Sequence, residues 1–150
     1  MRHKTPDAWK VGEIENAGDP VFIRHRLEKS GESDSSHEWL AIVTHHLATV
    51  QANGLPEPAY NDSLRQLDVS LIRALQPEDG DKVFLVETCH GKRSYYAYVR
   101  GIEAVGRAVQ GIINKNPEQT LTYRTAHDPA RNFARRYLTL IDNDIDLRLK

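Results

Sequence analysis

Two β-rich runs that meet at one tight turn constrain the fold more than any other feature of this sequence. The runs are Lys82–His90 and Lys92–Arg100, and Gly91 lies between them. Glycine adopts positive φ without steric cost, as the two-residue turns of β-hairpins require. The sequence therefore predicts an antiparallel β-hairpin here, around which the rest of the chain has to pack.

Amphipathic segments flank this hairpin on both sides. Apolar residues recur at helical spacing from about Ala59 to Gln76, and a second such stripe runs from Ile102 to near Asn114. Apolar residues on both faces of His37–Val50 predict a central strand, and alternation over Thr120–Thr125 predicts a last strand. The order strand, helix, strand, strand, helix, strand is that of the ferredoxin-like split βαβ sandwich, an α+β fold with both helices on one face of an antiparallel sheet.

We expect shorter elements on either side of this core. Apolar and polar residues alternate from Ala8 to Glu13 and from Pro20 to Glu28, which predicts an N-terminal hairpin, and the polar segment Lys29–Ser36 predicts a mobile loop. Asp128-Pro129 places an acid before a proline and predicts the start of a short helix. The weak alternation from Asp142 onward predicts an edge strand or a frayed tail. We expect a single domain, made of a hairpin and loop (1–36), a core (37–126), and a helix and tail (127–150).

Composition excludes several classes of protein. The 20 basic and 21 acidic residues leave a net charge of -1, so no overall field attracts the 150-residue chain to nucleic acid or to an anionic membrane. Cys89 is the single cysteine, which excludes a disulfide scaffold and favours a reducing compartment. No run of about 18 apolar residues is present, so we expect a cytoplasmic protein without a membrane span.

Few residues with catalytic or metal-binding chemistry are present, and their spacing is unfavourable. Cys89 and His90 are neighbours at the end of a predicted strand, so their side chains point to opposite faces, and the same holds for His45 and His46. No phosphate-binding, dinucleotide or nucleophile-elbow motif occurs. We therefore expect no cofactor, no metal site and no catalytic residue. The alternative is a small enzyme in which Cys89 or Glu87 meets a base in space.

Tyrosines and arginines provide the candidate binding surface. Tyr96, Tyr98 and Arg100 lie at every second position and share one face of a strand. Arg131 and Arg135 form a second basic group one helical turn apart. Tyrosine and arginine are enriched at protein interfaces. The sheet face opposite the two core helices is either solvated, covered by the N-terminal hairpin or the last helix, or used for binding, and the binding interpretation takes it as open. Aromatic packing within the sheet is the competing interpretation of the tyrosines.

Three segments resemble a bacterial family of unknown function, domain of unknown function 695. They are Asn53–Pro56 leading into Leu64–Leu75, the hairpin Val86–Tyr98, and Asp128-Pro129 before Phe133 and Tyr137. The resemblance implies a distant similarity of fold to RraB-type inhibitors of a bacterial endoribonuclease. Those inhibitors are ferredoxin-like sandwiches that bind protein and have no known catalytic site, so the resemblance implies a binding role.

Together these observations predict a non-catalytic interaction or regulatory module of a bacterium, acting on another protein through its open sheet face. An exposed edge strand could also join two copies into a homodimer. One alternative is a protein that binds RNA or single-stranded nucleic acid by stacking bases on the tyrosines. Another is an immunity protein that binds a bacterial toxin.

Overall fold

Strands and helices alternate along the chain in a mixed α+β fold. The computed structural model describes residues 9–27 and 36–148, with side chains as far as residue 141. The elements are β1 (Lys10–Asn16), β2 (Asp19–His25), β3 (Trp39–His46), α1 (Pro58–Ser63), α2 (Arg65–Ala74), β4 (Lys82–Cys89), β5 (Lys92–Val99), α3 (Ile102–Lys115), β6 (Thr120–His127) and α4 (Asn132–Arg148). The strands form one antiparallel sheet in the order β1-β2-β4-β5-β3-β6.

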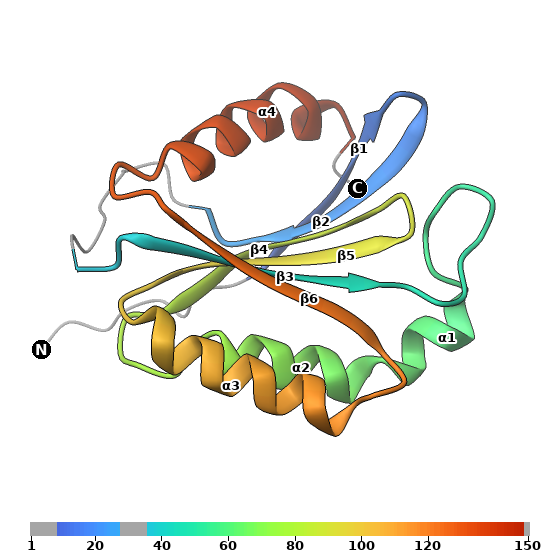
Figure 1. The fold of residues 1–150 in the computed structure, drawn as a ribbon. Helices are drawn as coiled ribbons and strands as arrows, with labels where there is room; N and C mark the ends of the chain where they lie inside the picture. The colour runs from blue at the N-terminus through green and yellow to red at the C-terminus, as the bar shows by residue number, and fades with distance from the viewer. Residues whose placement is uncertain (1–8, 28–35, 149–150) are drawn as a thin grey trace, which may run out of the picture.

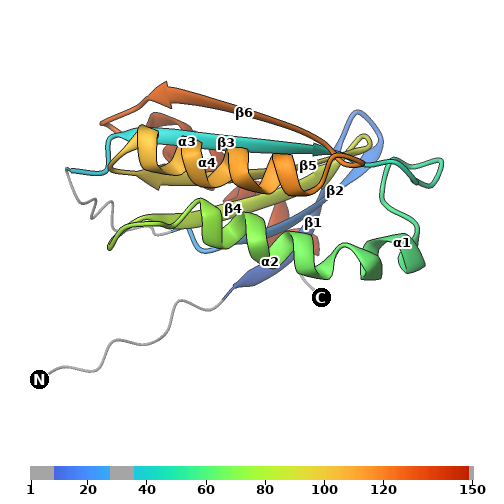
Figure 2. The same cartoon turned by 60° about the horizontal axis from the view of Figure 1, so that its bottom comes forward.

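Helices cover both faces of this sheet. α2 and α3 lie side by side on one face, and α4 lies on the other (Figures 1 and 2). Because side chains alternate along a strand, each inner strand contributes to two apolar cores. Tyr95, Ala97 and Val99 belong to the core under α2 and α3, whereas Tyr96 and Tyr98 belong to the core under α4. The sheet is therefore the middle of three layers.

The β4–β5 hairpin predicted from the sequence is confirmed. His90 and Gly91 form its turn with φ values of 52° and 78°, so both occupy the region of positive φ that this kind of turn requires. The pairing with β5 is irregular between Val83 and Leu85. As a result, Phe84 and Leu85 both belong to the core under α4.

The N-terminal hairpin is also confirmed, as β1 and β2 around a turn at Ala17 and Gly18. β2 pairs with β4, so this hairpin extends the sheet at one end. The predicted mobile loop Lys29–Ser36 lies outside the described residues except for Ser36. Among the helices that the structure describes, none combines the length and the apolar character needed to cross a membrane.

Two of the expected elements differ from the observed ones. The helix expected over residues 59–76 is broken into α1 and α2 at Leu64, whose φ of -91° and ψ of 3° lie outside the helical region. The tail after Asp142 is neither an edge strand nor a frayed end, because α4 continues to Arg148. That prediction was wrong because the apolar spacing of four, from the buried Tyr137 to the buried Ile141, continues a helix rather than a strand.

Asp81 joins three parts of the chain at one end of the sheet. Its carboxylate accepts hydrogen bonds from the backbone N–H groups of Glu78 (3.1 Å) and Arg100 (3.0 Å). The ring of His37, only 1% exposed, brings Nε2 to 3.2 Å from the same carboxylate. A Cβ at Gly80, which has a φ of 87°, would lie 2.6 Å from this ring. The turn before β4, the end of β5 and the segment before β3 therefore depend on one buried carboxylate.

We predict that Asp81→Ala destabilises the protein by about 3 kcal/mol, because two backbone N–H groups lose their acceptor inside the protein. Asp79→Ala is the matched control: the exposed Asp79 uses only its backbone carbonyl in this network, as the acceptor for His37. Its expected change is within about 0.5 kcal/mol. Urea unfolding of both variants checks the prediction, and equal losses would contradict it.

Candidate functional site

The sheet face that carries the predicted tyrosine surface is covered by α4. Tyr98 is only 2% exposed, and its ring stacks on Phe84 with 5.0 Å between centroids. Tyr96 is half-buried and stacks on Phe133 of α4 at 4.7 Å. Arg100 is exposed and lies just beyond the end of β5. The alternation placed both tyrosines on one face correctly, but the prediction that this face is open is wrong, because the last helix buries it.

The two arginines predicted near the last helix have different surroundings. The guanidinium carbon of Arg131 lies 4.4 Å from the centre of the Tyr98 ring, and its Nε is buried without a hydrogen-bond partner among the described residues. Arg135 is exposed on α4. The structure therefore brings Arg131 to Tyr98 as part of the helix packing.

Asp128 attaches the beginning of α4 to the sheet. Its carboxylate accepts hydrogen bonds from the hydroxyl of Tyr98 (2.7 Å) and from the backbone N–H groups of Asn132 (2.8 Å) and Phe133 (3.0 Å). Burial raises the pKa of Asp128, but these hydrogen bonds outweigh it and lower that pKa overall. Asp128 therefore binds the first turn of α4, but the helix start predicted at Asp128-Pro129 is wrong, because α4 begins at Asn132.

Further along α4, the hydroxyl of Tyr137 donates a hydrogen bond of 2.5 Å to Glu87 on β4. Cys89 lies two residues beyond Glu87, and burial together with the charge of Glu87 raises the pKa of its thiol. The ring of His90 instead approaches Asp19, with 3.1 Å from Nε2 to the carboxylate. Burial and the charge of Glu87 therefore favour the neutral thiol of Cys89, and His90 is turned to a different partner, so this arrangement does not prepare Cys89 as a nucleophile.

The two adjacent histidines of β3 point to opposite sides, as their spacing indicated. His45 is buried and its Nε2 lies 2.8 Å from the side-chain oxygen of Gln119, while burial lowers its pKa. Within the described part of the chain, no group of three or more His, Cys, Asp or Glu residues could hold a metal ion.

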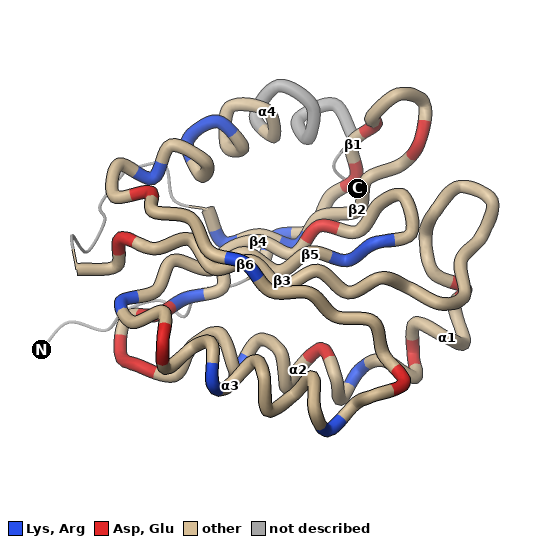
Figure 3. Tube along the Cα trace, viewed as in Figure 1, with Lys and Arg blue, Asp and Glu red and all other residues tan. Residues whose placement is uncertain are grey.

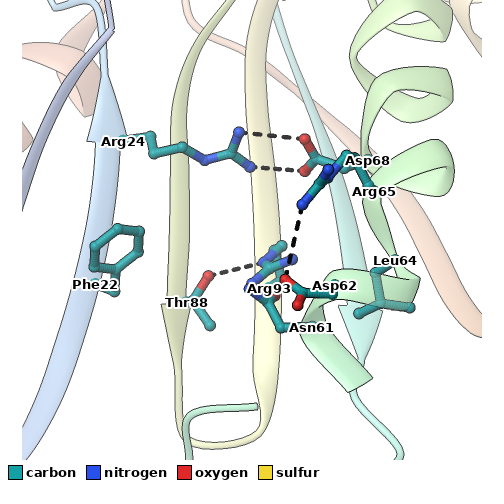
Figure 4. Close-up of a pocket in the computed structure, with 9 residues that line it drawn as sticks. All are labelled: Phe22, Arg24, Asn61, Asp62, Leu64, Arg65, Asp68, Thr88 and Arg93. Carbon is teal, nitrogen blue, oxygen red and sulfur yellow. Dashed lines mark hydrogen bonds and ion pairs between the residues drawn. The ribbon is translucent and has the colours of Figure 1, made fainter. Parts of the chain in front are cut away.

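A polar cavity of about 320 Å³ lies on the other side of the sheet, between β2, β4 and β5 and the two helices α1 and α2 (Figure 4). We call it the arginine pocket, because three arginines line it with two aspartates and an aromatic ring. These residues are Arg24, Arg65, Arg93, Asp62, Asp68 and Phe22.

One aspartate of the arginine pocket is fully engaged by its neighbours. Asp68 on α2 accepts two hydrogen bonds from the guanidinium of Arg24, at 2.7 and 3.2 Å. The buried hydroxyl of Tyr95 donates a further hydrogen bond of 2.6 Å to Asp68. Burial and the negative charge of Asp68 raise the pKa of Tyr95, so Tyr95 remains a neutral donor. The charges of Arg24 and Asp68 therefore compensate each other.

Arg93 on β5 differs because its partners are neutral. Arg93 is buried, with 8% of the residue exposed, and it donates from Nε to the Thr88 hydroxyl (3.0 Å) and from Nη2 to the Asn61 side-chain oxygen (2.7 Å). No carboxylate among the described residues forms an ion pair with it, and its Nη1 has no hydrogen-bond partner there. Arg65 and Asp62 are exposed and 3.8 Å apart, so they form a weak pair. Three arginines and two aspartates thus leave one positive charge in excess, at Arg93.

The sequence interpretation missed the arginine pocket because its residues come from several elements far apart in the chain. Arg24 and Asp68, for example, are 44 positions apart. One local signal was present: Arg93 occupies the same face of β5 as Tyr95 and Ala97, so a charged residue stands at a core-facing position of an alternating strand.

Comparison with known proteins identifies a family. The model of a family described as "Family of unknown function (DUF695)" matches residues 7–139. Neither a curated protein nor a solved structure matches the chain. The likeness to RraB-type inhibitors therefore stays a prediction.

The lowered pKa of Asp128 predicts a stability that depends on pH. Because the folded protein favours the carboxylate, its contribution is complete above the ordinary aspartate pKa and is lost as the pH falls through the lowered value. We expect Asp128→Asn to cost about 1 kcal/mol at pH 6 and progressively less towards pH 3. Urea unfolding at both pH values checks this, and a pH-independent difference would contradict it.

In the arginine pocket, substituting a charge that has an ionic partner should affect stability differently from substituting a charge that has none. Asp68→Asn leaves Arg24 without its carboxylate and should cost about 2 kcal/mol. Arg93→Gln removes a buried charge that has no carboxylate partner, so we expect thermal stability to stay the same or to rise. Thermal unfolding of both variants measures this, and a loss for Arg93→Gln as large as that for Asp68→Asn would contradict the assignment.

Proposed function

The chain belongs to the DUF695 family, and we propose that it is a non-catalytic interaction module whose arginine pocket receives an acidic side chain of a partner protein. The residues of the arginine pocket all lie within the matched range 7–139. The observation that carries the proposal is the buried guanidinium of Arg93, which has only neutral partners.

A carboxylate is the group that fits this position. A buried charge is costly unless it is paired, and a carboxylate matches the planar donor geometry of a guanidinium. Thr88 and Asn61 hold Nε and Nη2 of Arg93, so its orientation is set before a ligand arrives. The single excess positive charge favours one carboxylate over a doubly charged phosphate.

The rim of the arginine pocket suits a macromolecular partner. Phe22 on the wall is 38% exposed, and the side chain of Arg65 is 80% exposed. Aromatic residues and arginine are enriched where proteins bind each other, and energetic hot spots combine them around a desolvated centre. An acidic side chain that pairs with Arg93, with its apolar neighbours on Phe22, would use both features.

We also propose the ferredoxin-like arrangement for the core over residues 37–126. The strand order β6-β3-β5-β4 and the position of α2 and α3 on one face support it. In this interpretation the N-terminal hairpin and α4 are additions, and α4 covers the face that is open in the simplest form of the fold. A role as a toxin immunity protein would be one case of the proposed interaction function.

Nucleic-acid binding is less well supported. Acidic and basic residues are interspersed over strands and helices (Figure 3), so no extended basic track follows the described part of the sheet. The stacking platform of that alternative needs Tyr98, which lies beneath α4. An enzyme based on Cys89 lacks support as well, because the thiol pKa is raised.

Peptide selection tests the proposal directly. A random peptide library displayed on phage is selected against the immobilised full chain, and the best peptide is synthesised and titrated. We expect it to contain Asp or Glu, and we expect Arg93→Gln to weaken its binding at least about tenfold, as for the loss of a charge-assisted hydrogen bond. Arg107→Gln, on the exposed surface of α3, is the matched control and should leave the affinity unchanged.

Two further titrations identify the group that Arg93 binds. Replacing the peptide's acid by its amide should weaken binding as much as Arg93→Gln does, and combining both changes should add little. Selected peptides without an acid, or equal affinity for wild type and Arg93→Gln, would overturn the proposal. A third outcome has two parts: millimolar acetate displaces the peptide, and replacing the residues next to the acid leaves the peptide's affinity unchanged. This outcome would overturn the proposal of a protein partner and favour a small carboxylate as the ligand.

A further inference from the structure

β6 forms an edge of the sheet with one side unpaired among the described strands. It ends the strand order next to β3 and pairs with β3 over all eight of its residues. Figure 2 shows β6 along the upper margin of the sheet. In an antiparallel pair, alternate residues direct their N–H and C=O groups away from the partner strand. These groups of β6 are therefore available to a further strand.

The two edges of the sheet are protected unequally. β1, at the opposite edge, carries the exposed charges Lys10, Glu13 and Glu15, and α4 contacts it. β6 has a single charged residue, Arg124, and contains no lysine, proline or acid, and its register with β3 is continuous. Charged residues, prolines and bulges are the devices by which proteins prevent pairing at an edge. Apart from Arg124, β6 lacks them, so its edge is suited to pairing in a register that accommodates this one charge.

We propose that β6 of one copy pairs with β6 of a second copy of this chain, antiparallel across a two-fold axis centred on Tyr123. The two-fold axis is perpendicular to the sheet, so each face of the sheet continues into the same face of the second copy. The residue at the axis therefore lies opposite the same residue of the second copy. Centring on Tyr123 pairs residues 120–126 of both strands and places Thr122 of one copy opposite Arg124 of the other. This inference does not depend on the function proposed for the arginine pocket.

Charge selects this register over its neighbour. Centring on Arg124 also pairs seven residues, 121–127, but sets the two guanidiniums directly opposite each other, which is destabilising. With Tyr123 at the centre, each Arg124 faces a neutral threonine. Tyr123 itself is half-buried beside α3, so the aromatic pair would extend the apolar core across the axis.

The exposed side chain of Thr122 allows a test by charge sign. Thr122→Lys would place a lysine opposite Arg124 twice per dimer, whereas Thr122→Glu would place a carboxylate there. We expect sedimentation of the full chain to show a dimer, a dissociation constant raised about fivefold or more by Thr122→Lys, and one lowered by a similar factor by Thr122→Glu. The double variant Thr122→Lys/Arg124→Glu should restore dimerisation, because it exchanges the signs.

Controls distinguish edge pairing from unfolding and from association through a different surface. Both substitutions lie on an exposed position, so circular dichroism should match wild type, and thermal unfolding should match it at protein concentrations where wild type and both variants are monomeric. Arg93→Gln should leave the dimer unchanged, which makes the test independent of the arginine pocket. A monomer at every concentration, or a dimer that both Thr122 variants leave unchanged, would overturn the proposal. Equal weakening by lysine and glutamate would overturn the register centred on Tyr123.

Discussion

Both faces of the central sheet are apolar, and the rest of the structure follows from the need to cover them. β3, β4 and β5 alternate between two cores, with Val43, Val86 and Tyr95 on one side and Ile42, Leu85 and Tyr98 on the other. Leaving either side in water would forfeit the largest favourable contribution to folding. Two helices therefore cover one face, and α4 has to cover the other.

This arrangement leaves the function few places in which to act. With both faces covered, accessible chemistry is confined to the edges of the sheet and to gaps between layers. The arginine pocket is such a gap, and it lies where the break at Leu64 separates α1 from α2. Asn61, in the last turn of α1, supplies one of the two neutral partners that hold Arg93. The break in the helix and the uncompensated guanidinium are thus parts of one local structure.

Local pattern predicted the elements well where a single principle governed them. The turn at His90-Gly91 follows from backbone geometry and was predicted from neighbouring residues. The tyrosine face failed for a different reason. Tyr96 and Tyr98 were placed on the correct side of the sheet, but exposure depends on a helix more than thirty residues away in the chain.

The sequence by itself determined the alternation of strands and helices, the two-sided apolar character of the central strand β3 and the family of the chain, because periodicity and turn chemistry are local. Only the tertiary structure decided that α4 lies over the tyrosines and that Arg93 has neutral neighbours. The physical reason is that burial and charge compensation are properties of a residue's surroundings. Those surroundings are assembled from distant segments, as Arg93 with Asn61 and Arg24 with Asp68 illustrate.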